Sequence, residues 1–252
     1  MLFSRRFVGM KLLLPVVTLL ACIICDSVRA EELPAKRWHD QAELSFVQTG
    51  GNTDVTTLSL KNRLTYRVTR PLTLSWKVEA LNSMKSGTQT AERYLTELRG
   101  DYLITQRMYG FATTAWLRDR FAGIDAHYDG SLGVGYRFLD GPRHTLIGEA
   151  GLNYTYEQYI NNTSDDYPGS RLFGKYQFAI TERNVLSQSL EYLQDLELIR
   201  GQVLHSETAL TAALTDLFSL KASYTVRFNS KPVPARLKKT DTTLAMALVA
   251  TF

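Results

Sequence analysis

Apolar side chains alternate with polar ones through almost the whole chain after residue 38. In one early segment Leu60, Leu64 and Tyr66 hold even positions, while Lys61 and Arg63 hold odd ones. A period of two is that of a β-strand with two different faces, whereas an amphipathic helix repeats every 3.6 residues. The same alternation returns segment after segment up to residue 252. The sequence therefore predicts an all-β protein of about 12 strands.

The last segment, residues 240–252, shows why the apolar row needs a particular environment. Leu244, Met246, Leu248 and Phe252 form one apolar face, and the sequence stops on the aromatic ring. Such a face must be buried, and backbone crosses a bilayer only as a helix or a closed barrel. Mean hydropathy is −0.16, and no apolar run after the first thirty residues is long enough for a spanning helix. Residues 38–252 are therefore predicted to form a closed antiparallel transmembrane β-barrel.

Breaks in the alternation predict the two rims of this barrel. Short breaks fall at residues 69–71, 105–108, 139–143, 181–184 and 215–217, and longer polar ones at 81–90, 119–125, 158–169, 196–202 and 229–239. An even strand number returns both ends of the barrel to one side. We therefore expect short periplasmic turns and longer outer loops.

The polar row decides between a barrel in lipid and a soluble sandwich or barrel, which remains the alternative. A soluble barrel would turn its apolar row inward, but here the other row holds long side chains of both charges. The candidate lumen-lining residues are Lys61, Arg63, Arg67, Lys77, Glu79, Arg93, Glu97, Arg99, Arg171, Lys175, Glu207 and Arg227.

Aromatic residues near the strand ends of the apolar row are typical of the girdles at the two membrane interfaces. In residues 109–117 the apolar row is expected to change parity, which would place Tyr109 and Phe111 in a girdle. The expected girdle residues are Tyr66, Tyr102, Tyr109, Phe111, Tyr136, Phe138, Phe178, Phe218 and Phe252 at the short-turn rim, and Tyr94, Tyr128, Tyr154, Tyr156 and Phe228 at the other.

Residues 1–30 have the pattern of a secretory signal peptide. Arg5, Arg6 and Lys11 precede an apolar stretch at 12–24, and Val28-Arg29-Ala30 offers a small-x-small cleavage site. The alternative is lipidation of Cys22, which follows a lipobox-like Leu-Leu-Ala. Residues 31–37 are a polar lead-in to the barrel.

Removal of the predicted signal peptide changes both the cysteine content and the charge. Both cysteines, Cys22 and Cys25, lie within it, so no disulfide or cysteine-based metal site is expected. The cleavage also takes away four of the 29 basic residues and one of the 25 acidic ones, which leaves 25 against 24. Nucleic-acid binding is not expected of such a balanced chain.

Motifs for catalysis or metal binding are not evident, so no enzyme activity, cofactor or metal is predicted. The segment 50–54, Gly-Gly-Asn-Thr-Asp, is read as a hairpin turn in preference to a cation site. His127 and His205 are expected in the lumen, with Asp129 and Glu207 two residues away on the same face, as partners in an ordinary hydrogen-bonded lining in preference to a pH-responsive pair. His144 is expected outside, with no serine partner for a lipid-acting enzyme.

The chain resembles the family of salt-induced outer membrane proteins, a domain family of unknown function. The resemblance is carried by Trp38, the segments 42–45 and 58–66, and above all the Gly-Asn-Thr turn within 49–54. It implies a barrel in the outer membrane of Gram-negative bacteria. The terminal Phe252 likewise resembles the insertion signal that such barrels present to the barrel-assembly machinery.

The leading functional hypothesis is a narrow pore for ions or small anionic solutes, linked to salt or envelope stress. Its competitor is a non-conducting barrel whose lumen is plugged by ion pairs, because a 12-stranded barrel lies between the filled and the open sizes. A lipid-acting enzyme is a more distant alternative. The expected partners are outer-membrane lipid and lipopolysaccharide, the latter near basic loop residues such as Lys238 and Lys239.

Overall fold

The computed structural model describes residues 37–49, 55–197, 201–232 and 238–252. The predicted signal peptide and the hairpin turn at 50–54 lie outside these residues. Within them, no helix is long and apolar enough to cross a membrane. The one helical element is a 3₁₀ turn, η1 (Arg120–Ala122).

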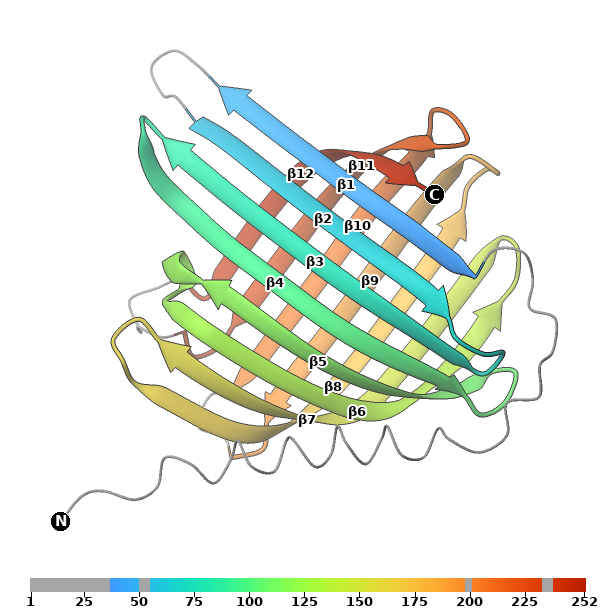
Figure 1. Cartoon of the computed structure of the whole chain (residues 1–252), viewed down its shortest axis with the longest axis horizontal. Coiled ribbons are helices and arrows are strands. Elements are labelled where there is room, and N and C mark those ends of the chain that lie inside the picture. Colours follow the sequence, from blue (N-terminus) through green and yellow to red (C-terminus); the bar gives the residue numbers. More distant parts are fainter. Residues whose placement is uncertain (1–36, 50–54, 198–200, 233–237) are drawn as a thin grey trace. The chain divides into compact units, whose positions relative to one another are not determined.

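Twelve antiparallel strands form a closed barrel, as the alternation predicts, and each strand pairs with its neighbours in sequence (Figure 1). The barrel closes where β1 pairs with β12, with Leu44 opposite Leu248. The strands are β1 (Trp38–Thr49), β2 (Val55–Arg67), β3 (Leu72–Lys85), β4 (Thr88–Leu103), β5 (Met108–Asp119), β6 (Ile124–Asp140), β7 (His144–Tyr159), β8 (Ser164–Ala179), β9 (Asn184–Asp195), β10 (Gln202–Ala213), β11 (Phe218–Asn229) and β12 (Thr240–Thr251).

The even-numbered apolar row faces outward and is the surface that meets lipid. Leu98, Leu132, Leu172 and Leu248 are all exposed, as are most of the expected girdle aromatics. Few residues are buried, because a barrel turns one face of every strand outward. The outward row is thus a continuous apolar surface around the barrel.

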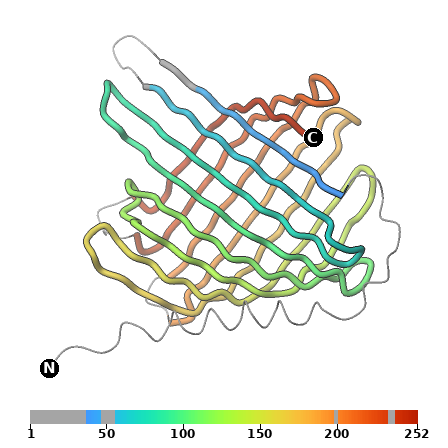
Figure 2. Tube along the Cα trace, viewed as in Figure 1, coloured from blue at the N-terminus to red at the C-terminus, as the bar shows by residue number. Residues whose placement is uncertain are grey.

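Three of the predicted outer loops, at 81–90, 119–125 and 158–169, are wrong in extent. At 81–90 and 158–169 the chain is mostly strand, and β3 joins β4 through Ser86 and Gly87 alone, both at positive φ. At 119–125 the connection shortens to η1 and Gly123. Strands of 14 to 17 residues exceed the roughly 9–11 residues that cross the hydrocarbon core. We therefore expect these hairpins to extend past the hydrocarbon core of the bilayer; Figure 2 shows the long strands that form them.

Four of the five short turns at the opposite rim share one hydrogen-bonding device. Threonine hydroxyls at positions 69, 105, 181 and 215 accept hydrogen bonds from backbone N–H groups two or three residues later. At Thr181 the donors are the N–H groups of Arg183 and Asn184, at 3.2 and 3.0 Å. The side chain thus fixes the turn locally, as hydroxyl turns do elsewhere.

Thr181→Val tests this device. It keeps the side-chain volume but removes the acceptor, so we expect the free energy of unfolding to fall by about 0.5–1.5 kcal/mol. Urea unfolding in lipid vesicles measures the loss. Thr181→Ser, which retains the hydroxyl, is the control, and an equal loss in both variants would contradict the role given to the hydroxyl.

Candidate functional site

Ion pairs on the odd-numbered face show that this face lines the lumen. The Nζ atom of Lys221 on β11 lies 3.2 Å from Glu43 on β1, although β12 lies between these strands. Arg99 on β4 reaches Glu149 on β7 over two intervening strands, at 2.7 Å. Side chains meet across skipped strands only on the concave side of the sheet. The charged row is therefore enclosed by the barrel.

Glu149 is the centre of the densest cluster. Its Oε1 accepts hydrogen bonds from Arg99 Nη2 at 2.7 Å and from the Tyr109 hydroxyl at 2.8 Å. Its Oε2 accepts from Arg171 Nη1 at 2.8 Å and Arg99 Nη1 at 3.2 Å. The carboxylate side chain is 2% exposed. Two guanidinium groups and a hydroxyl thus satisfy a buried carboxylate, as a buried charge requires.

The cluster continues along the wall in both directions. Arg99 also binds Asp101 on its own strand, at 2.7 Å. Arg171 binds Glu191 on β9 through Nε at 2.7 Å, and His205 on β10 lies 3.4 Å from Glu191. This charged belt therefore runs over the wall from β4 to β10.

Aromatic rings support the two central arginines. The Arg99 and Arg171 guanidinium carbons lie 4.8 and 5.3 Å from the centre of the Phe111 ring, and Arg171 also lies 5.1 Å from that of Phe173. Cation–π contacts of this kind orient a guanidinium group and are stronger where water is scarce. The rings therefore hold both arginines toward Glu149.

The expected change of parity at residues 109–117 is wrong. Tyr109 and Phe111 point into the lumen and are buried, and they lie opposite Gly135 and Gly133 of β6. A Cβ atom at Gly135 would lie 2.2 Å from the Tyr109 ring. The two glycines thus leave the space that the rings fill, and the outward row keeps even parity throughout.

A second group of charges lies on the wall formed by β1, β3, β10 and β11. Lys221 binds both Glu43 and Glu207, each at 3.2 Å. Lys77 and Glu79 of β3 are 2.7 Å apart. The register pairs Lys61 with Glu79 and Arg63 with Lys77, as the turn near Arg70 predicts.

All twelve candidate lumen residues lie at odd positions, on the face that carries these ion pairs. Arg93 approaches Asp119 at 3.7 Å. Among the described residues, no carboxylate lies within 4 Å of Lys61, Arg63, Lys175 or Arg227. Lys175 lies within electrostatic range of the cations Arg63 and Lys221 and, with smaller effect, of the carboxylates of Glu207 and Glu43. The lumen therefore contains both neutralised belts and cations without a close counter-ion.

The predicted partners of the lumen histidines are wrong. His127 contacts Glu157 of the neighbouring strand at 2.9 Å, and His205 contacts Glu191. Asp129 accepts instead from Ser131, Asn153 and Thr155, while Glu207 binds Lys221. The register explains these partners, because His127 lies directly opposite Glu157 on β7 and His205 directly opposite Glu191 on β9.

The sequence did not single out the central Glu149, and it placed Tyr109 and Phe111 in a girdle instead of the lumen. Glu149 has the odd parity of the charged row, and the Gly133-x-Gly135 spacing opposite two aromatics was a signal for inward rings. In the described ranges, no group of three or more His, Cys, Asp or Glu side chains could hold a metal ion.

Twelve strands, an apolar outer surface and a charged interior define an outer-membrane β-barrel fold. The sequence model of the family described as "Protein of unknown function, DUF481" matches residues 42–252. The chain belongs to this family.

The chain is also similar to individual proteins of known sequence or structure. The chain is 26% identical over 215 residues to the uncharacterized protein YdiY of Escherichia coli (strain K12), covering 84% of this chain and 82% of the relative. Among solved structures it is similar to the COG4313 outer membrane channel from Pseudomonas putida F1, with a TM-score of 0.53, 14% identity and coverage of 90% and 100%. It is also similar to the translocator domain of the autotransporter NalP from Neisseria meningitidis, with a TM-score of 0.49, 10% identity and coverage of 96% and 95%.

Proposed function

We propose that this barrel is a narrow, non-enzymatic pore of the outer membrane for ions or small anionic solutes. The observation that carries the proposal is that charged side chains of the lumen remain accessible to water. Asp101 is 26% exposed, Glu191 27% and Glu207 32%, although all three lie inside the barrel. A lumen filled by side chains would cover these groups, so their exposure supports a water-filled path along the wall.

The preference for anions rests on the cations without a close counter-ion. Lys61, Arg63 and Lys175 face the lumen, and the charges of Arg63 and Lys175 repel each other. An anion that passes between them relieves this repulsion, whereas a cation adds to it. Rings of Arg and Lys favour anions in other pores for the same reason.

The competing function is a barrel without transport, plugged by its ion pairs. The belt around Glu149 favours this alternative, because it crosses several strands and buries its central carboxylate. Single-channel recording in planar bilayers separates the two. Discrete conductance steps with a reversal potential on the anion side support the pore, and flat traces from correctly folded protein overturn it.

A triple variant, Lys61→Gln with Arg63→Gln and Lys175→Gln, tests the selectivity. Removing three lumen cations is expected to lower the chloride-to-potassium permeability ratio several-fold and to move the reversal potential toward cation preference. The matched control neutralises Lys231, Lys238 and Lys239 in the connection between β11 and β12, with the same change of net charge. A similar shift in both triples would mean that the lumen cations do not line the path.

Export and assembly complete the proposal. Residues 1–30 act as the signal peptide for the outer membrane, and Phe252 is presented with the last strand to the barrel-assembly machinery. The backbone N–H of Phe252 donates to the Asp40 carbonyl at 2.9 Å, which supports a role of the terminus in closing the barrel. A link to salt or envelope stress would appear as salt-dependent expression.

A further inference from the structure

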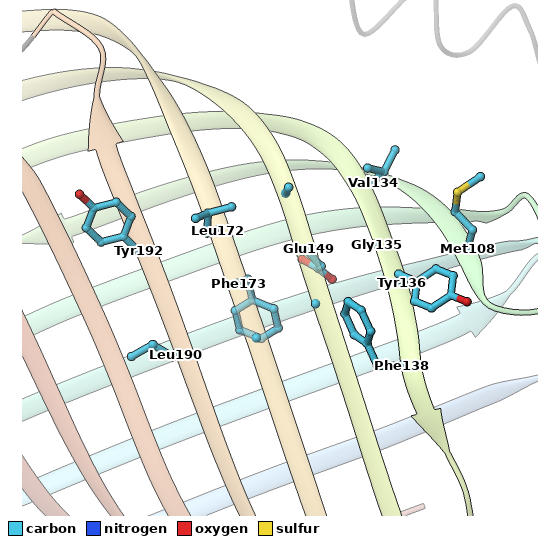
Figure 3. A pocket seen from close by; sticks show the side chains of 13 residues that line it. Met108, Val134, Gly135, Tyr136, Phe138, Glu149, Leu172, Phe173, Leu190 and Tyr192 are labelled. Atoms are coloured by element: carbon cyan, nitrogen blue, oxygen red, sulfur yellow. The ribbon is translucent and has the colours of Figure 1, made fainter.

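An apolar groove of about 520 Å³ lies on the lipid-facing side of β5 to β9 (Figure 3). Most of its lining residues have even numbers and so belong to the outward row. The floor is formed by Gly148, Ala150 and Gly174, and the walls include Phe138 and Leu190. The groove exists because glycines on β7 and β8 interrupt the row of large side chains that covers the rest of this face.

The space above Gly174 is open. A Cβ atom built there would meet only the Ile147 carbonyl oxygen, at 3.9 Å. Tyr136, Leu172 and Tyr192 extend the wall with rings and branched chains. A flexible hydrocarbon chain fits this lining, since it needs length and apolar contact but no hydrogen-bonding partner. In the bilayer, such chains surround this face.

A basic and aromatic cluster lies where β7 and β8 reach the short-turn rim, close to this groove. The His144 ring stacks on Phe178 at 5.0 Å, and its Nδ1 atom contacts the Tyr176 hydroxyl at 2.8 Å. The Arg143 guanidinium carbon lies over the Phe178 ring, 5.5 Å from its centre. His144 and Phe178 precede and follow the floor glycines by four residues along their strands. Side chains suited to a lipid headgroup thus lie at the short-turn rim, and the apolar groove lies farther along the same strands, toward the middle of the bilayer.

Arg143 is placed to bind an anion at the membrane interface. Among the described residues no hydrogen bond or ion pair involves its guanidinium group, so the N–H groups can bind a planar or tetrahedral oxyanion. The short turn between β4 and β5 adds Arg107, next to Met108 of the groove lining. The charge at this end of the groove is therefore complementary to a phosphate diester.

From these observations we propose that the groove is a binding site for one glycerophospholipid of the leaflet at the short-turn rim. One acyl chain lies over Gly148, Ala150 and Gly174, and the phosphate binds the guanidinium group of Arg143. The proposal rests on the outward orientation of this face and not on conduction through the lumen.

Native mass spectrometry of the full barrel, released from detergent micelles, tests the site with palmitoyl-oleoyl-phosphatidylglycerol as the probe. We expect one lipid to bind before further, weaker ones. Gly174→Leu fills the groove and is expected to weaken the first binding step by about tenfold. Gly100→Leu is the matched control, because Gly100 is an outward glycine on β4, away from the groove, with room for a Cβ atom.

The headgroup contact is tested separately, with a variant that leaves the groove intact. Arg143→Gln should abolish the preference for phosphatidylglycerol over a diacylglycerol with the same chains, whereas Lys239→Gln at the opposite rim should preserve it. Equal lipid binding by Gly174→Leu and the wild type, or equal losses in Gly174→Leu and Gly100→Leu, would overturn the site. A wild-type dimer that Gly174→Leu converts to a monomer would instead identify the groove as a protein interface and overturn the lipid proposal.

Discussion

Glu149→Gln is expected to lower the free energy of unfolding by about 3–5 kcal/mol, the usual cost of removing one partner from a buried ion pair. The amide keeps the shape of the carboxylate but not its charge. Arg99 and Arg171 then lose a shared counter-ion, and two of the four hydrogen bonds to the carboxylate meet an NH₂ group instead of an oxygen, because each oxygen accepts two of them. The effect is large because this side chain is almost inaccessible to water.

Reversible urea unfolding in phospholipid vesicles, followed by tryptophan fluorescence, measures this loss. The matched control is Glu97→Gln on β4, which also removes a lumen carboxylate. Among the described residues no cation lies within 4 Å of Glu97, so its replacement should cost less than about 1 kcal/mol. Equal costs in the two variants would contradict the central place of Glu149 in the belt.

Gly133→Ala is expected to destabilise the barrel by about 3 kcal/mol or more, the upper range for overpacking. The new Cβ atom would lie 2.3 Å from the Ala150 carbonyl oxygen and 2.8 Å from the Phe111 ring. The first of these contacts is with a backbone atom, so the clash can be relieved only if β6 and β7 move apart. The phenylalanine cannot swing away freely either, since it packs against both central arginines.

Gel mobility of unheated samples shows the consequence, because folded barrels migrate differently from boiled ones. A smaller folded fraction and a lower urea midpoint are expected for Gly133→Ala. The control is Gly110→Ala on β5, where the nearest atoms are 3.9 Å from the new Cβ. Wild-type behaviour of Gly133→Ala would show that β6 and β7 are not packed as closely as described.

The fold could be predicted from sequence because the alternation of apolar and polar side chains is repeated in every strand. The prediction therefore does not depend on any single segment. The error at β5 has a physical reason. Both rows of that strand are apolar or small, with Tyr109 and Phe111 on one side and Ala112 and Trp116 on the other, so hydrophobicity alone does not orient it. The opposing Gly133 and Gly135 decide the orientation, and they lie on another strand.

The outer hairpins were hard to delimit for a related reason. Beyond the hydrocarbon core both faces of a strand can contact water, so the selection for alternating side chains disappears. Residues such as Asp165 and Asp166 of β8 then look like loop residues, although they pair with β7.

The candidate site was predictable by residue type but not by partner. Parity alone assigns Lys61, Arg99 and Arg171 to the enclosed row. Which carboxylate each cation binds depends on the curvature of the barrel wall and on glycines, which leave room for long side chains. Arg99 reaches Glu149 over Gly133 in this way. These long side chains reach across two intervening strands, so the pairing of adjacent strands does not predict their contacts.

The accessibility of spin labels along β2 tests most directly whether the apolar row faces lipid and the charged row faces the lumen. Single cysteines from Ser59 to Tyr66, in vesicle-embedded protein from which the first thirty residues and their cysteines have been removed, are labelled and exposed to oxygen and to a nickel chelate. Labels at Leu60, Leu64 and Tyr66 should favour oxygen, which dissolves in lipid, and labels at Lys61, Arg63 and Thr65 should favour the chelate, which stays in water. Uniform accessibility, or the reverse alternation, would show that the charged row is not enclosed by the barrel.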